Sequence, residues 1–396
     1  PEGTRDLLYG ECQLYRTVRQ ELTAVFQRCG YSEIATPVVE YYNVFSKAGR
    51  SVPEEGTLKM IDRSGRILVL RPDCTLPIAR VTATHLQHEP LPQRLYYDET
   101  IFRAATVNAG HMSEVDQCGV ELIGADGTRA DAEAVAVALE ALQSCQLQNY
   151  RIELGHAAFF RALAGELGAD EIQVEEIRAL IEQKSFAALD DLLREQYSDK
   201  PSYQALCRLS RLFGGAEVLA EARSLTDNPA ALQALDELSA IYDALCAAGW
   251  GAYVGFDLGL VHQLDYYTGM VFCGYVEGSG HVVVTGGRYD ALMGKFGRSA
   301  PATGFAVDVA GVAGALPVQE VKTAHKLVHY EAGCLGAAMK LQCSAGAGEI
   351  ELSCCENEEE SRRLAHHSHT GCAYRFRRAG RIRLKGEGLC IVCRLP

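Results

Sequence analysis

The feature that most constrains the fold is a helical block set between two groups of strands. From about residue 159 to residue 248 the sequence is acidic, repeats apolar residues at helical spacing and has no strand pattern. Strand-like runs precede this block and resume after it. Because the strands do not alternate regularly with helices, the pattern predicts an α+β fold: an antiparallel sheet flanked by helices, with a helical insertion.

Hydrophobic periodicity gives the individual elements around this block. Strands are predicted at residues 67–70, 94–103, 115–123, 150–154, 252–256, 267–275 and 281–284. Helices are predicted at residues 11–28 and 131–145 and from residue 289, and a strand followed by a helix at 303–316. Residues 31–40 are predicted to form an extended arm, since Pro37 disfavours a helix there.

The pattern changes after residue 317, where a linker leads into alternating short strands and helices. Strands are predicted at 326–329, 349–353, 374–376 and 382–384, and helices at 332–342 and 357–367. We therefore predict two domains: residues 1–318, which include the insertion, and a small C-terminal α/β domain of residues 325–396.

Composition narrows the class of protein. The formal net charge of −13 falls mainly on the first domain, which disfavours a nucleic-acid-binding surface there. No apolar run approaches the roughly 20 residues that cross a bilayer, and the start of the sequence does not resemble a secretory signal. The 15 cysteines fit reduced thiols better than a small disulfide scaffold, so a cytoplasmic protein is expected.

Near the C-terminus, Cys390 and Cys393 have the spacing of a zinc knuckle. A structural zinc needs a second spaced pair, and Cys354 and Cys355 are adjacent instead. We expect neither a metal nor a cofactor.

The segment LRPDCT is the first candidate for a binding site. Asp73 and Thr75 follow a predicted strand, and a carboxylate with a hydroxyl can hold an ammonium group. The alternative is a plain turn in which Asp73 accepts hydrogen bonds from its own backbone. The segment alone favours the turn.

Two further segments carry polar or glycine-rich patterns. IFR, residues 101–103, and the returning strand 115–123 predict a hairpin in which Gln117 and Glu121 share one face. That face meets solvent or lines a polar pocket. Farther on, Gly286 and Gly287 in TGGRYDALM allow a tight turn or the close approach of a ligand.

Taken together, these segments resemble the histidyl-tRNA synthetases over nearly all of the first 318 residues. GYSEIATPVVE resembles the first class II synthetase motif, and IFR with GHMSEVDQCGVELIG resembles the second. LVHQLDYYTG and GGRYDALMGKFG resemble the two histidine segments, and ATGFAVDV resembles the third motif. The resemblance implies a class II aminoacyl-tRNA synthetase-like sheet and pairing of two copies through the first motif.

The chain departs from the synthetases where they hold ATP. Ala105 replaces the adenine-contacting glutamate, and residues 110–115 lack the two arginines of the second motif. His262 and Gly311 stand where the family has its catalytic and its third-motif arginine. Stabilising charge on an α-phosphate requires cationic groups, and Arg103 alone remains. The departures imply that no aminoacylation occurs and that the chain has no catalytic residues.

The positions that contact histidine in the family are mostly retained. Asp73, Thr75 and Gln117 correspond to residues that hold the α-amino group, although aspartate is one methylene shorter than the family's glutamate. Glu121 and Tyr267 correspond to the imidazole side. The resemblance thus implies a histidine-binding set of Asp73, Thr75, Arg103, Gln117, Glu121, Tyr266 and Tyr267.

This combination is similar to the synthetase-like paralogue, the regulatory subunit of ATP phosphoribosyltransferase. RPDCTLPIAR and the linker into a small C-terminal domain also resemble that family. The resemblance implies a non-catalytic cytoplasmic subunit for the first step of histidine biosynthesis. It would activate a short catalytic subunit, mediate feedback inhibition by histidine, and form a homodimer within a hetero-octamer.

Two alternatives stay open from the sequence. One is a genuine histidyl-tRNA synthetase, against which the lost ATP contacts argue. The other is a synthetase-like module that senses tRNA, supported by the basic stretch of residues 375–385. A solvated strand face explains that stretch as well, since charge runs usually face water.

Overall fold

The structure is a computed structural model that describes residues 3–46, 56–104, 112–261, 267–317, 326–346, 349–367 and 373–376. The chain divides into two compact units, Pro1–Val318 and Gln319–Pro396. Among the helices described, none is both long and apolar enough to cross a membrane.

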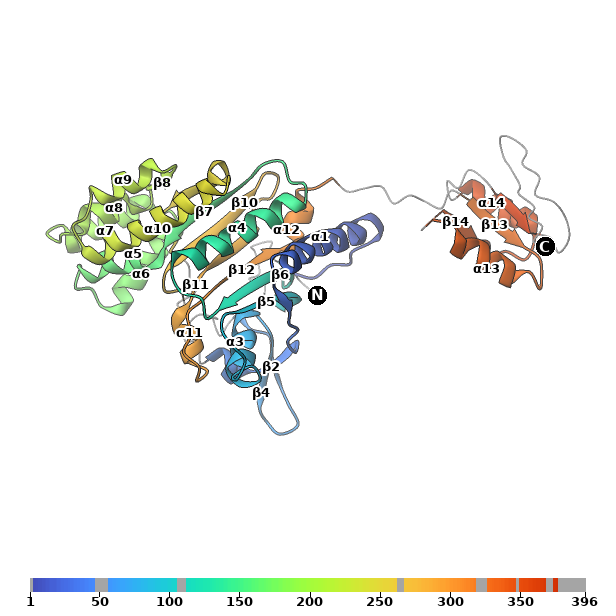
Figure 1. Cartoon of the computed structure of the whole chain (residues 1–396), viewed down its shortest axis with the longest axis horizontal. Coiled ribbons are helices and arrows are strands. Elements are labelled where there is room, and N and C mark those ends of the chain that lie inside the picture. Colours follow the sequence, from blue (N-terminus) through green and yellow to red (C-terminus); the bar gives the residue numbers. More distant parts are fainter. Residues whose placement is uncertain are drawn as a thin grey trace. The chain divides into compact units, whose positions relative to one another are not determined.

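The first unit is built on a nine-stranded sheet within the described residues, and Figure 1 shows helices packed against it. In sheet order the strands are β1 (Ser32–Glu33), β5 (Gln93–Phe102), β6 (Glu114–Ile123), β12 (Ala302–Asp308), β11 (Val284–Arg288), β10 (Met270–Val276), β7 (Tyr150–His156), β9 (Val254–Asp257) and β8 (Phe213–Gly214). Neighbours pair antiparallel, except that β1 with β5 and β7 with β9 are parallel. The predicted α+β class with an antiparallel sheet is confirmed.

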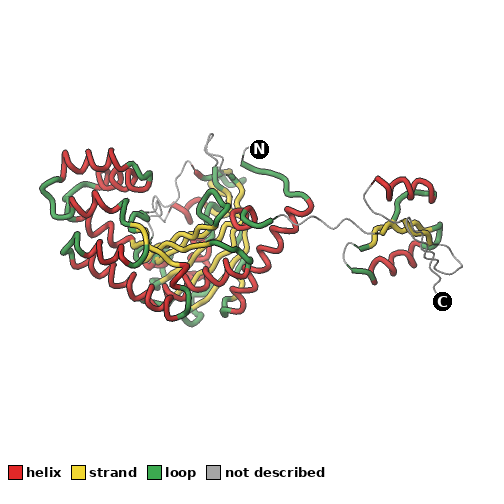
Figure 2. The backbone as a smooth tube through the Cα atoms, turned by 90° about the horizontal axis from the view of Figure 1, so that it is seen from above, coloured by secondary structure: helices red, strands yellow, loops and turns green. Residues whose placement is uncertain are grey.

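One face of this sheet carries the main hydrophobic core, and Figure 2 shows the helices running along it. The covering helices are α1 (Tyr9–Arg28), α4 (Thr128–Ser144), α10 (Pro229–Ala247) and α12 (Val309–Gly314). In α1, Val18, Leu22 and Val25 recur at helical spacing and are buried in this core. The helix ends before Gly30, whose φ of 83° is the left-handed conformation that glycine adopts easily.

The predicted insertion is helical in the structure. It contains α5 (Ala157–Gly165), α6 (Glu171–Glu182), α7 (Phe186–Tyr197), α8 (Tyr203–Leu209) and α9 (Glu217–Arg223), and its last helix is α10. Helix α10 starts with Pro229 after Asn228, whose side chain accepts the backbone N–H groups of Ala230 and Ala231. One detail was wrong: the block was predicted to lack strands, and the two-residue strand β8 lies in it, paired with β9.

A small antiparallel sheet lies beside the other face of the large sheet. Its order is β2 (Val39–Tyr41), β4 (Ile67–Leu70) and β3 (Lys59–Ile61). A second core cluster joins it to α2 (Tyr42–Ser46), α3 (Thr75–Thr84) and α11 (Asp290–Gly294). This cluster forms the floor beneath the candidate site.

The tight turn suggested for the paired glycines was wrong. The strand predicted at 281–284 begins at Val284 and continues through Gly286 and Gly287 to Arg288. A side chain at position 286 would meet the Phe272 ring at 2.5 Å, so glycine is required by packing between strands.

The second unit contains a three-stranded parallel sheet of order β14-β13-β15 in its described part. Its elements are β13 (Lys326–Tyr330), α13 (Leu335–Ser344), β14 (Ile350–Leu352), α14 (Glu358–His367) and β15 (Ala373–Phe376). The strand predicted at 382–384, the cysteines 390 and 393 and most of the basic stretch lie outside the described residues.

Candidate functional site

A pocket on the face of the large sheet opposite α1 and α4 brings most of the predicted residues together. Asp73, Thr75, Arg103, Gln117, Glu121 and Tyr267 all line it. The remaining predicted residue, Tyr266, lies outside the described residues, as do Ala105 and His262.

The β5–β6 hairpin presents two of these side chains. Its strands pair from Gln93 with Ile123 to Phe102 with Glu114. Because successive side chains alternate across a strand, Cys118, Val120 and Leu122 enter the helix-covered core. The residues between them face the other way, so Gln117 and Glu121 both reach the pocket.

The Asp73 segment is held by a buried arginine. Arg71 Nη1 forms an ion pair with Glu99 Oε1 at 2.8 Å, and Arg71 Nε donates to the carbonyl of Thr100 at 2.8 Å. Asp73 Oδ1 then accepts the backbone N–H of Leu76 at 2.9 Å. The turn expected from sequence is therefore present, and the same residue lines the pocket.

Glu121 is the most buried acid of the site, with only 1% of its surface exposed. The hydroxyl of Thr75 donates to its Oε1 at 2.7 Å, and the hydroxyl of Tyr289 donates to its Oε2. Gly304 pairs with Glu121 across β12 and β6, and a side chain at 304 would collide with the carboxylate. Glycine thus makes room for this acid in the sheet.

Burial shifts the two carboxyls of the pocket toward their protonated forms. Desolvation raises the pKa of Glu121 to about 8; the bonds from Tyr289 and Thr75 oppose that shift, and the nearby charge of Asp73 adds to it. Desolvation also raises the pKa of Asp73, against the Leu76 N–H and the charge of Arg103. A ligand with cationic or N–H groups would relieve the cost of charging these acids.

The pocket is narrow. Its cavity volume of about 40 Å³ is room for roughly three water molecules, at 10–15 Å³ for each. A ligand of amino-acid size therefore requires the lining side chains to move apart.

Sequence reasoning missed three polar residues of the lining, Tyr97, Thr285 and Tyr289. Tyr289 is the most informative because it bonds Glu121 directly. It lies in the GGRYDALM segment, which drew attention for its glycines. The available signal was position: Tyr289 lies two residues after the glycine pair and directly follows β11, which ends beside the pocket.

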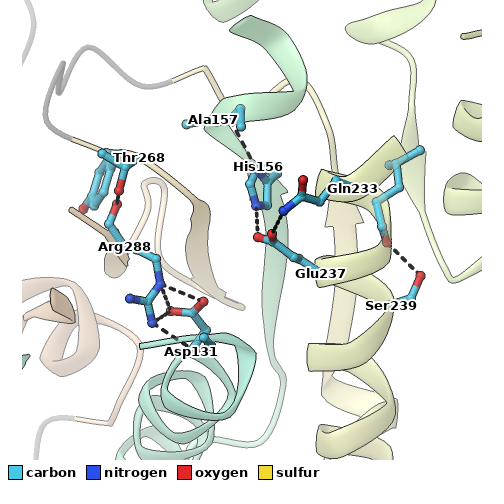
Figure 3. A network of polar contacts seen from close by, with 12 residues as sticks. Asp131, His156, Ala157, Gln233, Glu237, Ser239, Thr268 and Arg288 are labelled. Atoms are coloured by element: carbon cyan, nitrogen blue, oxygen red, sulfur yellow. Dashed lines mark hydrogen bonds and ion pairs between the residues drawn. The ribbon is translucent and has the colours of Figure 1, made fainter. Parts of the chain in front are cut away.

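A buried ion pair positions the two pocket tyrosines. Figure 3 shows Arg288 in contact with Asp131 of α4, with Nε 3.0 Å from both carboxylate oxygens. The carbonyl of Arg288 accepts the backbone N–H of Thr268 at 2.7 Å. Because Thr268 follows Tyr267 and Arg288 precedes Tyr289, this contact fixes both ring-bearing segments.

The same view shows how the sheet joins the insertion. His156, at the end of β7, bonds Glu237 of α10 through Nε2 at 3.0 Å. Its Nδ1 accepts the backbone N–H of Ala158, so the proton of the neutral ring lies on Nε2 and is donated to Glu237. This bond lowers the pKa of Glu237.

Of the positions that replace ATP-binding residues, the structure describes residues 112–115 and Gly311, and the space around Gly311 is informative. A side chain there would meet Val283 at 2.7 Å and His281 Nε2 at 3.0 Å. His281 in turn bonds Asp308 Oδ2 at 2.9 Å. An arginine therefore does not fit at 311 unless this pair moves.

Comparisons with known sequences agree with this architecture. The family model of histidyl-tRNA synthetase matches residues 3–312. An ATP phosphoribosyltransferase regulatory subunit of Clostridium kluyveri is 37% identical over 92% of this chain and 96% of its own length. One of Bacillus cereus is 38% identical over 92% of this chain and 88% of its own.

Solved structures give the same result. An ATP phosphoribosyltransferase regulatory subunit/histidyl-tRNA synthetase from Bacillus halodurans superposes with a TM-score of 0.83 at 30% identity, over 92% of this chain and 95% of that one. A histidyl-tRNA synthetase from Nostoc, at 18% identity and a TM-score of 0.75, covers 94% of this chain and 89% of its own. The Nostoc protein supports the class II fold alone.

Proposed function

The chain belongs to the ATP phosphoribosyltransferase regulatory subunit family, and from this premise we propose that it activates a short catalytic subunit and transmits feedback inhibition by histidine. Its role is regulatory, in histidine biosynthesis. The proposal adds the mode of regulation and the site, and it assigns no chemical step to this chain.

The pocket around Glu121 carries the histidine part of the proposal. An imidazole ring offers an N–H, and an α-ammonium group offers a charge. Asp73 and Glu121, two carboxyls whose pKa values are raised by desolvation, match both groups. The hydroxyls of Thr75 and Tyr289 hold Glu121 in place, so its carboxyl is oriented before a ligand enters.

The lost ATP contacts support a chain without aminoacylation activity. Among the pocket-lining residues described, Arg103 is the one guanidinium, and a side chain at position 311 would collide with Val283 and His281 as they stand. An α-phosphate would lack the cations that aminoacyl-adenylate formation requires. We expect no histidine-dependent exchange of pyrophosphate into ATP, and robust exchange would support the synthetase alternative.

Self-association within a hetero-octamer is also part of the proposal. The small sheet has an apolar face, because Tyr41 and Met60 both pair with Leu68, and Val39 pairs with Leu70. Val39, Tyr41 and Met60 are each 39% exposed. A contiguous apolar sheet face in a soluble chain is typical of a surface that another chain covers. It lies next to the segment that resembles the pairing motif of class II synthetases.

The decisive experiment mixes this chain with a short-form catalytic subunit from the same organism and follows formation of phosphoribosyl-ATP. We expect stimulation on mixing, co-elution of the two chains and reversal of the stimulation by histidine. Lack of both stimulation and co-elution would contradict the activating role. Stimulation that histidine leaves unchanged would remove the feedback part alone.

A further inference from the structure

Arg161 on α5 is a guanidinium beside the pocket that no carboxylate pairs with in the part of the chain described. Its Nη2 donates to the carbonyl of Tyr267 at 2.7 Å, and its Nε donates to the carbonyl of Ala157 at 3.3 Å. An arginine has five N–H donors in a flat fork, so these two bonds leave donors available. The residue as a whole is exposed to solvent, and its contact with the carbonyl of Tyr267 is partly buried.

The other arginines near the site each lie near an acid. Arg71 is bound to Glu99, and Arg288 is bound to Asp131. Arg103 donates to the carbonyl of Pro72 and lies close enough to Asp73 to lower its pKa. Arg161 is therefore the cation of this region whose charge no acid balances among the described residues.

Histidine has three polar groups: an ammonium group, an imidazole and a carboxylate. The charges of the pocket match the first two. Asp73 and Glu121 suit an ammonium group and an imidazole, and a carboxylate still requires a cation. Tyr267 lines the pocket, and its carbonyl accepts a hydrogen bond from Arg161, so the guanidinium lies next to a residue of the pocket. Burial lowers the pKa of Arg161, and a bound anion would offset that desolvation.

We propose that Arg161 binds the carboxylate of the amino acid that occupies this pocket. The inference rests on the proposed histidine site and names the group that makes the site selective for a free amino acid. A ligand with the same ring and ammonium group and without the carboxylate should then bind more weakly.

The test compares L-histidine with L-histidinamide, whose neutral amide replaces the carboxylate. Both are titrated by calorimetry into the full-length chain and its variants. Hydrogen bonds between charged groups contribute enough to predict at least a tenfold preference of the unmodified chain for histidine. Arg161→Gln should remove this preference by weakening histidine alone, and Arg161→Lys should retain part of it.

Two further variants make the outcome specific. Arg194→Gln, on an exposed ion pair of α7, is the control that should keep the full preference. Arg103→Gln tests the other guanidinium. If Arg161→Gln keeps the preference, or if Arg103→Gln alone abolishes it, the assignment is overturned. If the unmodified chain does not bind histidine, the histidine part of the proposed function fails and the assignment with it. Unchanged melting temperatures of the variants exclude unfolding as the cause of any loss.

Discussion

At the scale of single residues, the carboxyl of Glu121 links the site to the stability of the fold. Its pKa rises from 4.5 to about 8 in the folded chain. Between these values the native state keeps a proton that the unfolded state has released. The free energy of unfolding should therefore fall as the pH rises through this window, by at most about 1.4 kcal/mol per pH unit, and level off outside it.

Glu121→Gln isolates this contribution, since glutamine cannot titrate. Urea unfolding of both proteins at several pH values across the window gives the comparison. We expect the stability difference between them to change with pH in the sense given above. Parallel pH profiles would show that Glu121 does not carry the linked proton.

The second prediction at this scale is that substitutions in the pocket weaken the binding of histidine. Glu121→Ala and Gln117→Ala should each weaken binding by about tenfold or more, because each removes a polar partner from the pocket. Tyr267→Phe should cost less, since only a hydroxyl is lost. Asp116→Asn, on the opposite face of β6, is the matched control. Calorimetric titration measures all four, and equal affinities throughout would move the regulatory site elsewhere.

The sequence predicts which face a side chain points to where regular spacing along a strand determines it. It does not predict contacts that depend on the tertiary arrangement of distant segments. Gln117 and Glu121 are four apart on one strand, so their common face followed from strand geometry. Tyr289 reaches Glu121 from a segment far away in the chain. No local pattern encodes that contact, because it depends on how β6, β12 and β11 lie side by side.

At the scale of elements too, the sequence predicts what local spacing determines and misses what tertiary contacts determine. The insertion was predictable because its helices are long enough for periodicity to show. Strand β8 has two residues, which is too short for any period, and it exists because Phe213 pairs with Asp257 of β9. The glycines of β11 made this strand hard to predict, because the neighbouring ring of Phe272 requires glycine at position 286.

The ion pair between the end of β4 and strand β5 gives a prediction for elements. Arg71 and Glu99 have side chains only 4% and 6% exposed. Arg71→Met would leave Glu99 buried and unpaired, which costs about 3–5 kcal/mol of stability. The double variant Arg71→Met with Glu99→Gln should recover part of that loss. Urea unfolding of the single and double variants measures the coupling, and a strictly additive result would contradict a direct interaction.

At the scale of the whole molecule, regulation needs more than a pocket. Histidine can inhibit an assembly only if it binds one state of that assembly more tightly than another. The bond from His156 to Glu237 joins the end of β7 to α10, the last helix of the insertion. Arg161 lies about one turn into α5, which begins directly after β7. The pocket residue Tyr267 is therefore joined to α5, at the start of the insertion, by the hydrogen bond from Arg161 to its carbonyl.

Association of two copies supplies the last prediction, because it depends on a surface. Met60 lies on the apolar face of the small sheet, paired with Leu68, whereas Ile61, paired with Ile67, points to the opposite face. Both side chains are exposed, Met60 by 39% and Ile61 by 76%. If two copies pair through this face as proposed, Met60→Asp should convert the dimer to a monomer, since a charge would be desolvated in the interface.

Ile61→Asp introduces the same charge at the next residue and should leave the dimer intact. Sedimentation velocity over a range of protein concentrations distinguishes the two variants. A cooperative melting transition of each variant confirms that folding is preserved. The reverse pattern, with Ile61→Asp dissociating the dimer and Met60→Asp not, would place the interface on the other face of the sheet. A monomeric unmodified chain would contradict the proposed pairing of two copies.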